Sequence, residues 1–172
     1  VKDIAITSGD GEDVGLTEAR YHRFARALSE LEAWQAKLAS DFPGAADFVI
    51  AHRLIEGDAS SAAEAESLIE SLPANGYELS VTERLEDRLR IKVVETETSA
   101  AEFVELPVAL LTSASYESLR RAYQRLAEIV GTPGFRLVYG KKTATAATYA
   151  ELRSKALELA KEGMHISRFK GL

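Results

Sequence analysis

The chain has 172 residues, and its apolar fraction of 46% and charged fraction of 28% are ordinary for a soluble globular protein. It contains no cysteine, which excludes disulfides, thiolate nucleophiles and cysteine-ligated zinc, and which fits a cytoplasmic location. The apolar runs are short and interrupted by charges, so we expect no membrane span. The three histidines, His22, His52 and His165, lack the close spacing of metal ligands, so we expect no metal site on them.

The net charge of −6 is unevenly distributed along the chain. Residues 1–72 hold 6 Lys/Arg and 14 Asp/Glu, and residues 73–107 hold 4 and 8. Residues 108–172 hold 11 Lys/Arg and 5 Asp/Glu, so this last part is basic. A polyanion would therefore be repelled by the first part of the chain and attracted to the last. The chain begins at Val1 rather than at a methionine, and we expect a fragment of a longer protein.

The first elements in chain order are a strand, a turn and a long helix. Residues 2–8 alternate enough to predict a short strand, and residues 9–13 have the glycines and acids of a turn. Thr17 is the predicted N-cap of a helix that extends to Asp41, because apolar residues recur at steps of three and four. That stripe comprises Phe24, Leu28, Leu31, Trp34 and Leu38. We expect Trp34 to anchor the core.

Two shorter helices are expected next. The first covers residues 45–56, after the helix-breaking pair Pro43-Gly44. The second begins after Ser60 or Ser61, either of which can cap it, and it ends before Pro73.

The middle of the chain changes from helical to alternating periodicity. Residues 77–81 and 89–93 alternate between apolar and polar side chains, which predicts a β-hairpin. Residues 103–106 are a third candidate strand, and Pro107 indicates a strand end or a sheet edge.

The last third returns to helices. Residues 116–129 carry an apolar stripe typical of a helix, and residues 135–139 predict a short strand. A final helix is expected from its cap Thr148 to Gly163, followed by an emerging strand at residues 165–169. Together these elements predict an α/β (α+β) fold, with an N-terminal helical part followed by a small mixed or antiparallel sheet flanked by helices.

Three short motifs suggest chemistry that their surroundings do not support. Residues 56–60 (Glu-Gly-Asp-Ala-Ser) resemble a magnesium motif, but the chain has no Asp-x-Asp to supply further carboxylates. Residues 140–143 (Gly-Lys-Lys-Thr) lack the first glycine of a phosphate loop and are expected to form a basic loop. Residues 10–13 lack the ligand spacing of a calcium loop. We therefore expect no catalytic residue and no metal site in this chain.

The C-terminal segment carries a family resemblance. Residues 163–172 (Gly-Met-His-Ile-Ser-Arg-Phe-Lys-Gly-Leu) resemble the first half of the Gly-x-x-Ile-x-Arg-Tyr/Phe-Lys-Gly-Leu-Gly-Glu-Met signature of the B subunit of DNA gyrase and its relatives. Residues 1–4 are similar to the segment after the TOPRIM core of that family. Many bacterial gyrase B subunits carry a large insertion between these two segments. The resemblance thus implies four parts: residues 1–14 flanking the TOPRIM core, a helical part of the insertion (15–75), its α/β part (76–162), and the start of the signature (163–172).

The resemblance implies a non-catalytic piece of an ATP-dependent type IIA DNA topoisomerase, which buttresses the catalytic core and helps to position DNA. The ATP site and the Mg²⁺ carboxylates would lie elsewhere in the full-length enzyme. The expected partners are DNA, the A subunit of DNA gyrase and the rest of the B subunit, with no membrane. Two alternatives stay open: the same region of topoisomerase IV, or an independent protein-interaction module.

Five cations are candidate DNA contacts. Arg168 and Lys170 lie in the signature, and Arg136, Lys141 and Lys142 lie in or beside the predicted strand before it. Such side chains would contact phosphates and give salt-dependent affinity without reading the bases.

Overall fold

The computed structural model describes residues 4–72 and 76–170, with side chains described as far as residue 162. The chain forms two compact units. The terminal unit comprises residues 1–30 and 124–172, and the central unit comprises residues 31–123. Two long helices contribute residues to both: α1 (Glu18–Asp41) and α5 (Ala114–Val130). These compact units cut across the four parts implied by the resemblance, which stay predictions.

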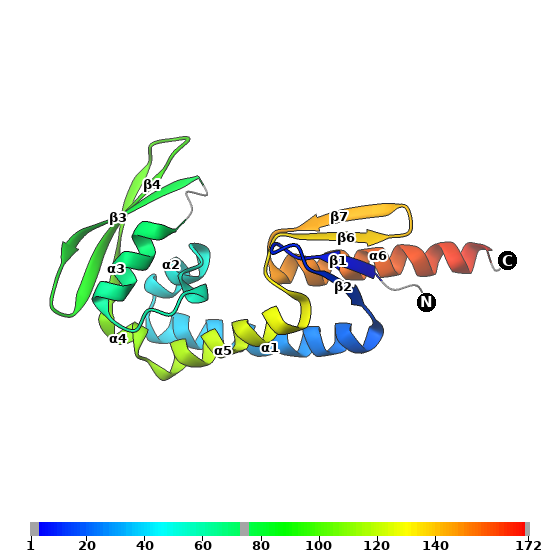
Figure 1. Ribbon diagram of the computed structural model, residues 1–172, viewed down its shortest axis with the longest axis horizontal. Coiled ribbons are helices and arrows are strands. Elements are labelled where there is room, and N and C mark those ends of the chain that lie inside the picture. Colours follow the sequence, from blue (N-terminus) through cyan, green and yellow to red (C-terminus); the bar gives the residue numbers. More distant parts are fainter. Residues whose placement is uncertain (1–3, 73–75, 171–172) are drawn as a thin grey trace. The chain divides into compact units, whose positions relative to one another are not determined.

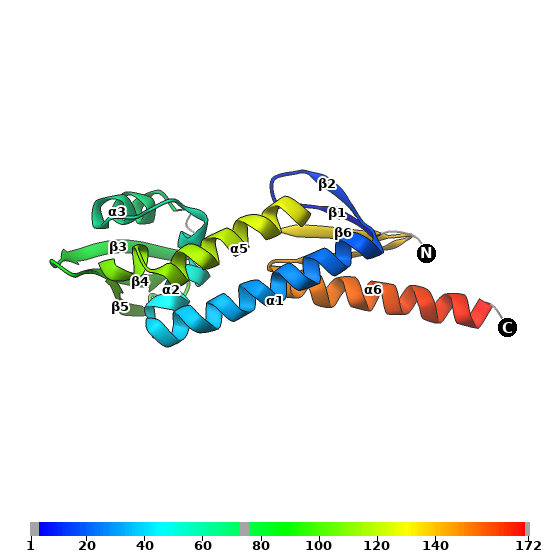
Figure 2. The same ribbon diagram turned by 90° about the horizontal axis from the view of Figure 1, so that it is seen from below.

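The terminal unit is built on a four-stranded sheet formed by both ends of the chain. Its further elements are β1 (Ile4–Thr7), β2 (Asp13–Leu16), β6 (Phe135–Tyr139), β7 (Lys142–Ala146) and α6 (Tyr149–Lys170). The strand order is β2-β1-β6-β7, and every neighbouring pair is antiparallel. Helix α6 lies against one face of this sheet (Figures 1 and 2). Because β1 pairs with β6, the two ends of the chain meet in one sheet, although a long segment of the chain separates these strands in sequence.

Apolar side chains from the sheet and from α6 form the core of this unit. Ile6 and Leu137, which are register partners on β1 and β6, are fully buried. Tyr149 is buried at the start of α6, where its ring lies 5.6 Å from that of Phe135 and 6.5 Å from that of Phe24. Its hydroxyl donates to the carbonyl of Gly131 at 2.8 Å, which ties the start of α6 to the end of α5.

Two loops of the terminal unit interlock at one end of the sheet. The amide of Gly9 donates to the carbonyl of Thr132 at 3.0 Å. A Cβ on Gly9 would lie 2.1 Å from the carbonyl oxygen of Pro133, so only glycine fits there. Gly131, in the other loop, has a φ of +87, and a Cβ on it would lie 2.5 Å from the Cβ of Ser8. This position therefore also requires glycine.

The central unit packs short helices on a three-stranded antiparallel sheet of order β3-β4-β5. Its elements are α2 (Ala45–Ala51), the 3-10 helix η1 (Leu54–Glu56), α3 (Ala62–Ser71), β3 (Tyr77–Arg84), β4 (Arg88–Glu95), β5 (Ala101–Pro107) and α4 (Val108–Leu111). Leu89, Ile91 and Val93 alternate along β4 and are all buried. Helix α3 lies beside β3, and α2 lies beside β5. The expected fold class, an N-terminal helical part followed by a small sheet flanked by helices, is thus confirmed.

The predicted helix starts are confirmed by side-chain caps. The hydroxyl of Thr17 accepts from the amide of Arg20 at 3.1 Å, and that of Ser61 accepts from the amide of Glu64 at 3.2 Å. Thr148 caps α6 in the same way. The predicted stop at Pro73 lies outside the described residues.

Three predictions about elements are wrong. The helix predicted over residues 45–56 ends at Ala51, because Arg53 takes a left-handed conformation (φ 60) before η1 begins. The strand predicted at residues 165–169 is instead part of α6, which continues through Gly163. A glycine inside a helix costs only about 1 kcal/mol, and no proline follows to end the helix. The expected core anchor Trp34 is only half-buried.

No helix in the described part of the chain combines the length and the apolar character that a membrane crossing requires.

Candidate nucleic-acid interface

Three of the five predicted DNA contacts lie on the β6–β7 hairpin of the terminal unit. The segment expected to be a basic loop after β6 is only partly a loop. Gly140 and Lys141 form the turn of the hairpin, and Lys142 is already the first residue of β7. The positive φ of Gly140 (+63) suits this tight turn.

Arg136 and Lys142 lie on opposite faces of the β6–β7 hairpin. Side chains alternate between the two faces of a strand, and register partners share a face. Arg136 is paired with Thr145 and lies on the face away from the buried Phe135. Lys142 is paired with Tyr139 and lies on the side of α6, where its Nζ is 2.7 Å from a carboxylate oxygen of Glu162. These two cations therefore do not form one cluster.

The ion pair of Lys142 fixes the tip of the hairpin beside α6. Glu162 lies on α6, so this pair joins the first residue of β7 to the helix. Lys142 itself is paired with a carboxylate, and an exposed ion pair is worth at most about 1 kcal/mol. Lys141 has no ion pair among the described residues, so it is the better placed of the two lysines for contacting a phosphate.

Arg136 lies on an open sheet face with small neighbours. Its register partners are Thr7 on β1 and Thr145 on β7. The next row holds Ala5, Val138 and Thr143. Arg136 is exposed and makes no ion pair within the described part of the chain, and the hydroxyl of Thr145 beside it can donate to a phosphate. One carboxylate, Asp13, lies on the same face but accepts a hydrogen bond from Thr7 at 2.7 Å.

Arg168 and Lys170 belong to the last turn of α6, and their side chains lie outside the described residues. Their helical backbone differs from the strand that the sequence predicts, so the spacing of these two residues follows a helix rather than a strand.

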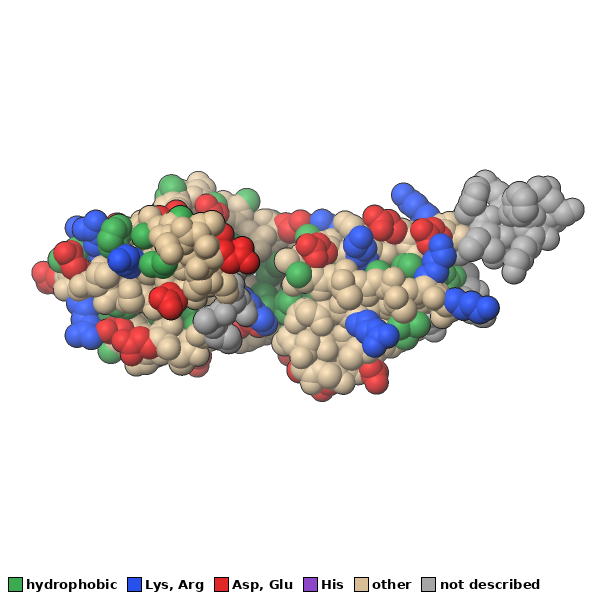
Figure 3. Space-filling model, turned by 90° about the horizontal axis from the view of Figure 1, so that it is seen from above, with side chains coloured by type: hydrophobic (Ala, Val, Ile, Leu, Met, Phe, Trp, Pro, Cys, Tyr) green, Lys and Arg blue, Asp and Glu red, His purple; other side chains and the backbone are tan. Residues whose placement is uncertain are grey.

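The charge asymmetry of the sequence becomes a difference between the two units. The terminal unit contains 13 Lys/Arg and 10 Asp/Glu, a formal charge of +3. The central unit contains 8 Lys/Arg and 17 Asp/Glu, a formal charge of −9. Figure 3 shows Lys and Arg side chains interspersed with carboxylates over the right-hand part of the view, which is the terminal unit. Of the two, only the terminal unit has a charge that would favour a polyanion.

The acidic motifs are engaged in ion pairs and hydrogen bonds. Glu56 accepts from Arg53, and Asp58 lies 2.7 Å from Arg120. Asp10 accepts from the hydroxyl of Ser8, which lowers the pKa of its carboxyl. No group of three His, Cys, Asp or Glu residues among those described is placed to hold a metal ion.

Buried phenols account for the clearest changes in acidity. Burial raises the pKa of Tyr116 to about 12 and also raises that of Tyr123, against the opposing effect of nearby arginines. Burial lowers the pKa of His52, while Glu102 acts in the opposite direction. Tyr116 is buried, Tyr123 and His52 are half-buried, and we interpret all three as packing side chains.

Sequence reasoning missed Thr143 and Thr145. The run Lys142–Ala146 (Lys-Thr-Ala-Thr-Ala) alternates with period two, and that was the signal for β7 and for a second row of hydroxyls beside Arg136.

No protein-family model matches this chain, and no curated protein matches it.

Proposed function

We propose that this chain is the non-catalytic insertion domain of a DNA gyrase B subunit, an ATP-dependent type IIA DNA topoisomerase. The observation that carries the proposal is the C-terminal segment, residues 163–172, which resembles the Arg-Tyr/Phe-Lys-Gly-Leu signature of that family. The distribution of charge supports it, because the unit that contains this segment is the basic one. In this proposal the domain buttresses the catalytic core and helps to position DNA during supercoiling.

The chain would contribute orientation rather than chemistry. The residues that hold ATP and Mg²⁺ would lie in other parts of the enzyme, which would act in the cytoplasm together with the A subunit. Within this chain, Lys141 at the hairpin tip and Arg136 on the open sheet face would contact phosphates. Such contacts fix the path of a duplex without reading its sequence. The pairing of β6 with β7 along its whole length supports this role, since a positioning group has to be held in place.

The central unit would act differently. Its charge of −9 opposes close approach of DNA, so it would serve as a spacer or as a surface for proteins. Topoisomerase IV is the nearest alternative for the whole chain. An independent protein-interaction module is the second, and it is favoured by Phe103, whose side chain is 51% exposed and lies 4.6 Å below the guanidinium of Arg90.

Charge reversal in the full-length protein tests the DNA role. The double substitution Arg136→Glu and Lys141→Glu reverses the two hairpin cations that make no ion pair among the described residues. The matched control is the double substitution Lys37→Glu and Arg121→Glu, which reverses one exposed lysine and one exposed arginine of the central unit. We expect the hairpin variant to bind a linear duplex more weakly, with the slope of log K against log salt reduced by about 0.9 for each lost phosphate contact.

The control should leave both the affinity and that slope unchanged. If the hairpin variant also binds DNA with unchanged affinity and slope, then Arg136 and Lys141 do not contact DNA.

A further inference from the structure

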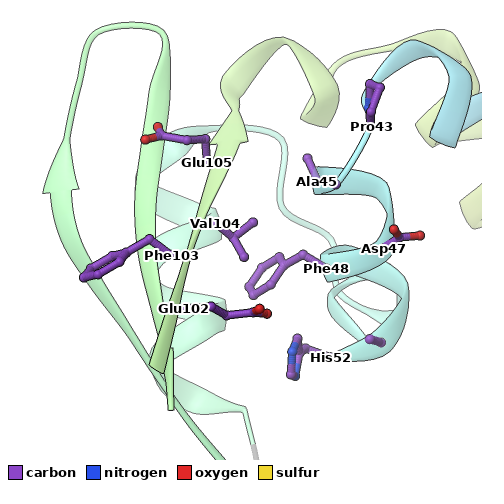
Figure 4. Close-up of a pocket in the computed structure, with 11 residues that line it drawn as sticks. Pro43, Ala45, Asp47, Phe48, His52, Glu102, Phe103, Val104 and Glu105 are labelled. Atoms are coloured by element: carbon purple, nitrogen blue, oxygen red, sulfur yellow. The ribbon is translucent and has the colours of Figure 1, made fainter. Parts of the chain in front are cut away.

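A groove of 530 Å³ opens in the central unit between α2 and the edge strand β5. Four consecutive residues, 102–105, line it. Figure 4 shows Glu102 and Val104 directed toward α2, and Phe103 and Glu105 directed to the other side of the strand. Since all four nevertheless border the groove, β5 presents its backbone edge to it.

That edge has no strand partner among the described residues. The sheet order is β3-β4-β5, so β5 is hydrogen-bonded as a strand to β4 alone. On an edge strand every second residue directs its N–H and C=O away from the sheet. An extended peptide can pair with such groups and add a fourth strand.

Packed aromatic rings form part of the wall opposite β5. Phe48 is 4% exposed, and its ring lies 5.1 Å from the ring of His52. The ring of His52 in turn lies 5.1 Å from that of Tyr77 in an edge-on arrangement. Phe48 and His52 line the groove together with Val104 on β5, so a side chain that enters it would meet these three residues.

The rim of the groove is acidic. Asp47, Glu102 and Glu105 line it, and no Lys or Arg does among the residues that the structure describes. Glu105 is paired with Arg88 at 2.8 Å, whereas Asp47 and Glu102 have no ion pair with Lys or Arg in that same part of the chain. The whole unit has a formal charge of −9, which attracts cations and repels acidic segments.

We propose that this groove binds an extended, basic segment of a partner protein as an added strand on β5. Backbone pairing with the edge would provide the affinity, and alternate side chains would divide between two environments. One set would face Phe48, Val104 and Glu102 on the side of α2, and the other set would face Phe103 and Glu105 on the opposite side of the strand. A Lys or Arg in the first set would lie beside the carboxylate of Glu102. This inference does not depend on the proposed DNA role, because it concerns the acidic unit rather than the basic one.

Labelled peptides test the proposal with the 172-residue chain. The probe is a peptide of about eight residues, alternating lysine and valine, and its counterpart has glutamate in place of lysine. Two further probes carry N-methyl groups on all lysines or on all valines, which removes one set of backbone donors at a time. We expect the basic peptide to bind at least about tenfold more tightly than the acidic one, and one N-methylated form to lose binding.

Matched substitutions locate the site. Glu102→Lys should weaken binding about tenfold, whereas Glu86→Lys makes the same charge change in the β3–β4 turn outside the groove and should leave it unchanged. Glu102→Gln, which removes the charge without reversing it, provides a second variant if circular dichroism shows that Glu102→Lys unfolds the chain. The proposal fails if the two N-methylated peptides both bind like the parent, if the groove and control variants weaken binding equally, or if the acidic peptide binds as well as the basic one.

Discussion

The hydroxyl of Tyr149 offers a test of how the terminal unit is held together. It is buried at the start of α6 and donates to the carbonyl of Gly131 at 2.8 Å, a good length for such a bond. Tyr149→Phe keeps the ring packed between Phe24 and Phe135 and removes the donor alone. Because a buried carbonyl then loses its partner, we expect a loss of about 1–3 kcal/mol in the free energy of unfolding.

Tyr116 provides the matched comparison. Its hydroxyl is also buried, but it lies 3.4 Å from the carbonyl of Leu54, beyond the usual length of an O–H···O bond. We expect Tyr116→Phe to cost less than about 0.5 kcal/mol, since little hydrogen bonding is lost. Urea unfolding followed by circular dichroism measures both variants. A Tyr149→Phe protein as stable as the parent, or a larger loss for Tyr116→Phe, would refute the reasoning.

Three further predictions concern the loop at Gly9, the pH dependence of stability and a helix cap. Gly9→Ala should lower the free energy of unfolding by about 2–3 kcal/mol, because the added Cβ would overlap the backbone of Pro133. Gly15→Ala is the control, since Gly15 has open space around it, and it should change the melting temperature little. The pKa of His52 is lowered below its ordinary value of 6.5, so the unfolded chain binds more protons below that pH and stability should fall as the pH drops through 6.5. His52→Gln should reduce this loss in thermal melts at about pH 7.5 and pH 5.5 relative to the parent, and an unchanged pH dependence would contradict it. Ser61→Ala should cost about 1 kcal/mol in urea unfolding through the lost cap of α3, and no change would show that the cap contributes nothing.

Local signals in the sequence were enough to predict most elements. Thr17, Ser61 and Thr148 cap the helices that follow them, as their positions before apolar stripes predict. The β3–β4 hairpin follows from the alternation of its two strands. These features depend on side chains only a few residues apart, which is why one sequence suffices.

Pairing between distant segments could not be predicted in the same way. Strands β1 and β6 are short, and nothing in Ile4–Thr7 specifies Phe135–Tyr139 as its neighbour. The opposite directions of Arg136 and Lys142 follow from that sheet, so the sequence grouped two cations that the fold separates. The groove was missed for the same reason, because it exists only where α2 lies beside β5.

The boundaries of the central unit allow it to be deleted while the terminal unit is kept. Glu30 and Arg125 lie at the points where α1 leaves the terminal unit and α5 returns to it, and their side chains are 2.6 Å apart. A short glycine-serine linker can therefore replace residues 31–123 and keep the sheet of the terminal unit intact.

The most direct measurement is ATP-dependent supercoiling of relaxed plasmid by the full-length protein together with its gyrase partner, with and without residues 31–123. The proposed function predicts that the intact enzyme supercoils DNA, and that the deletion slows supercoiling while leaving ATP hydrolysis and DNA cleavage in place, because the reacting groups lie elsewhere. An intact enzyme without ATP-dependent strand passage would contradict it, and so would a deletion that abolishes ATP hydrolysis and cleavage.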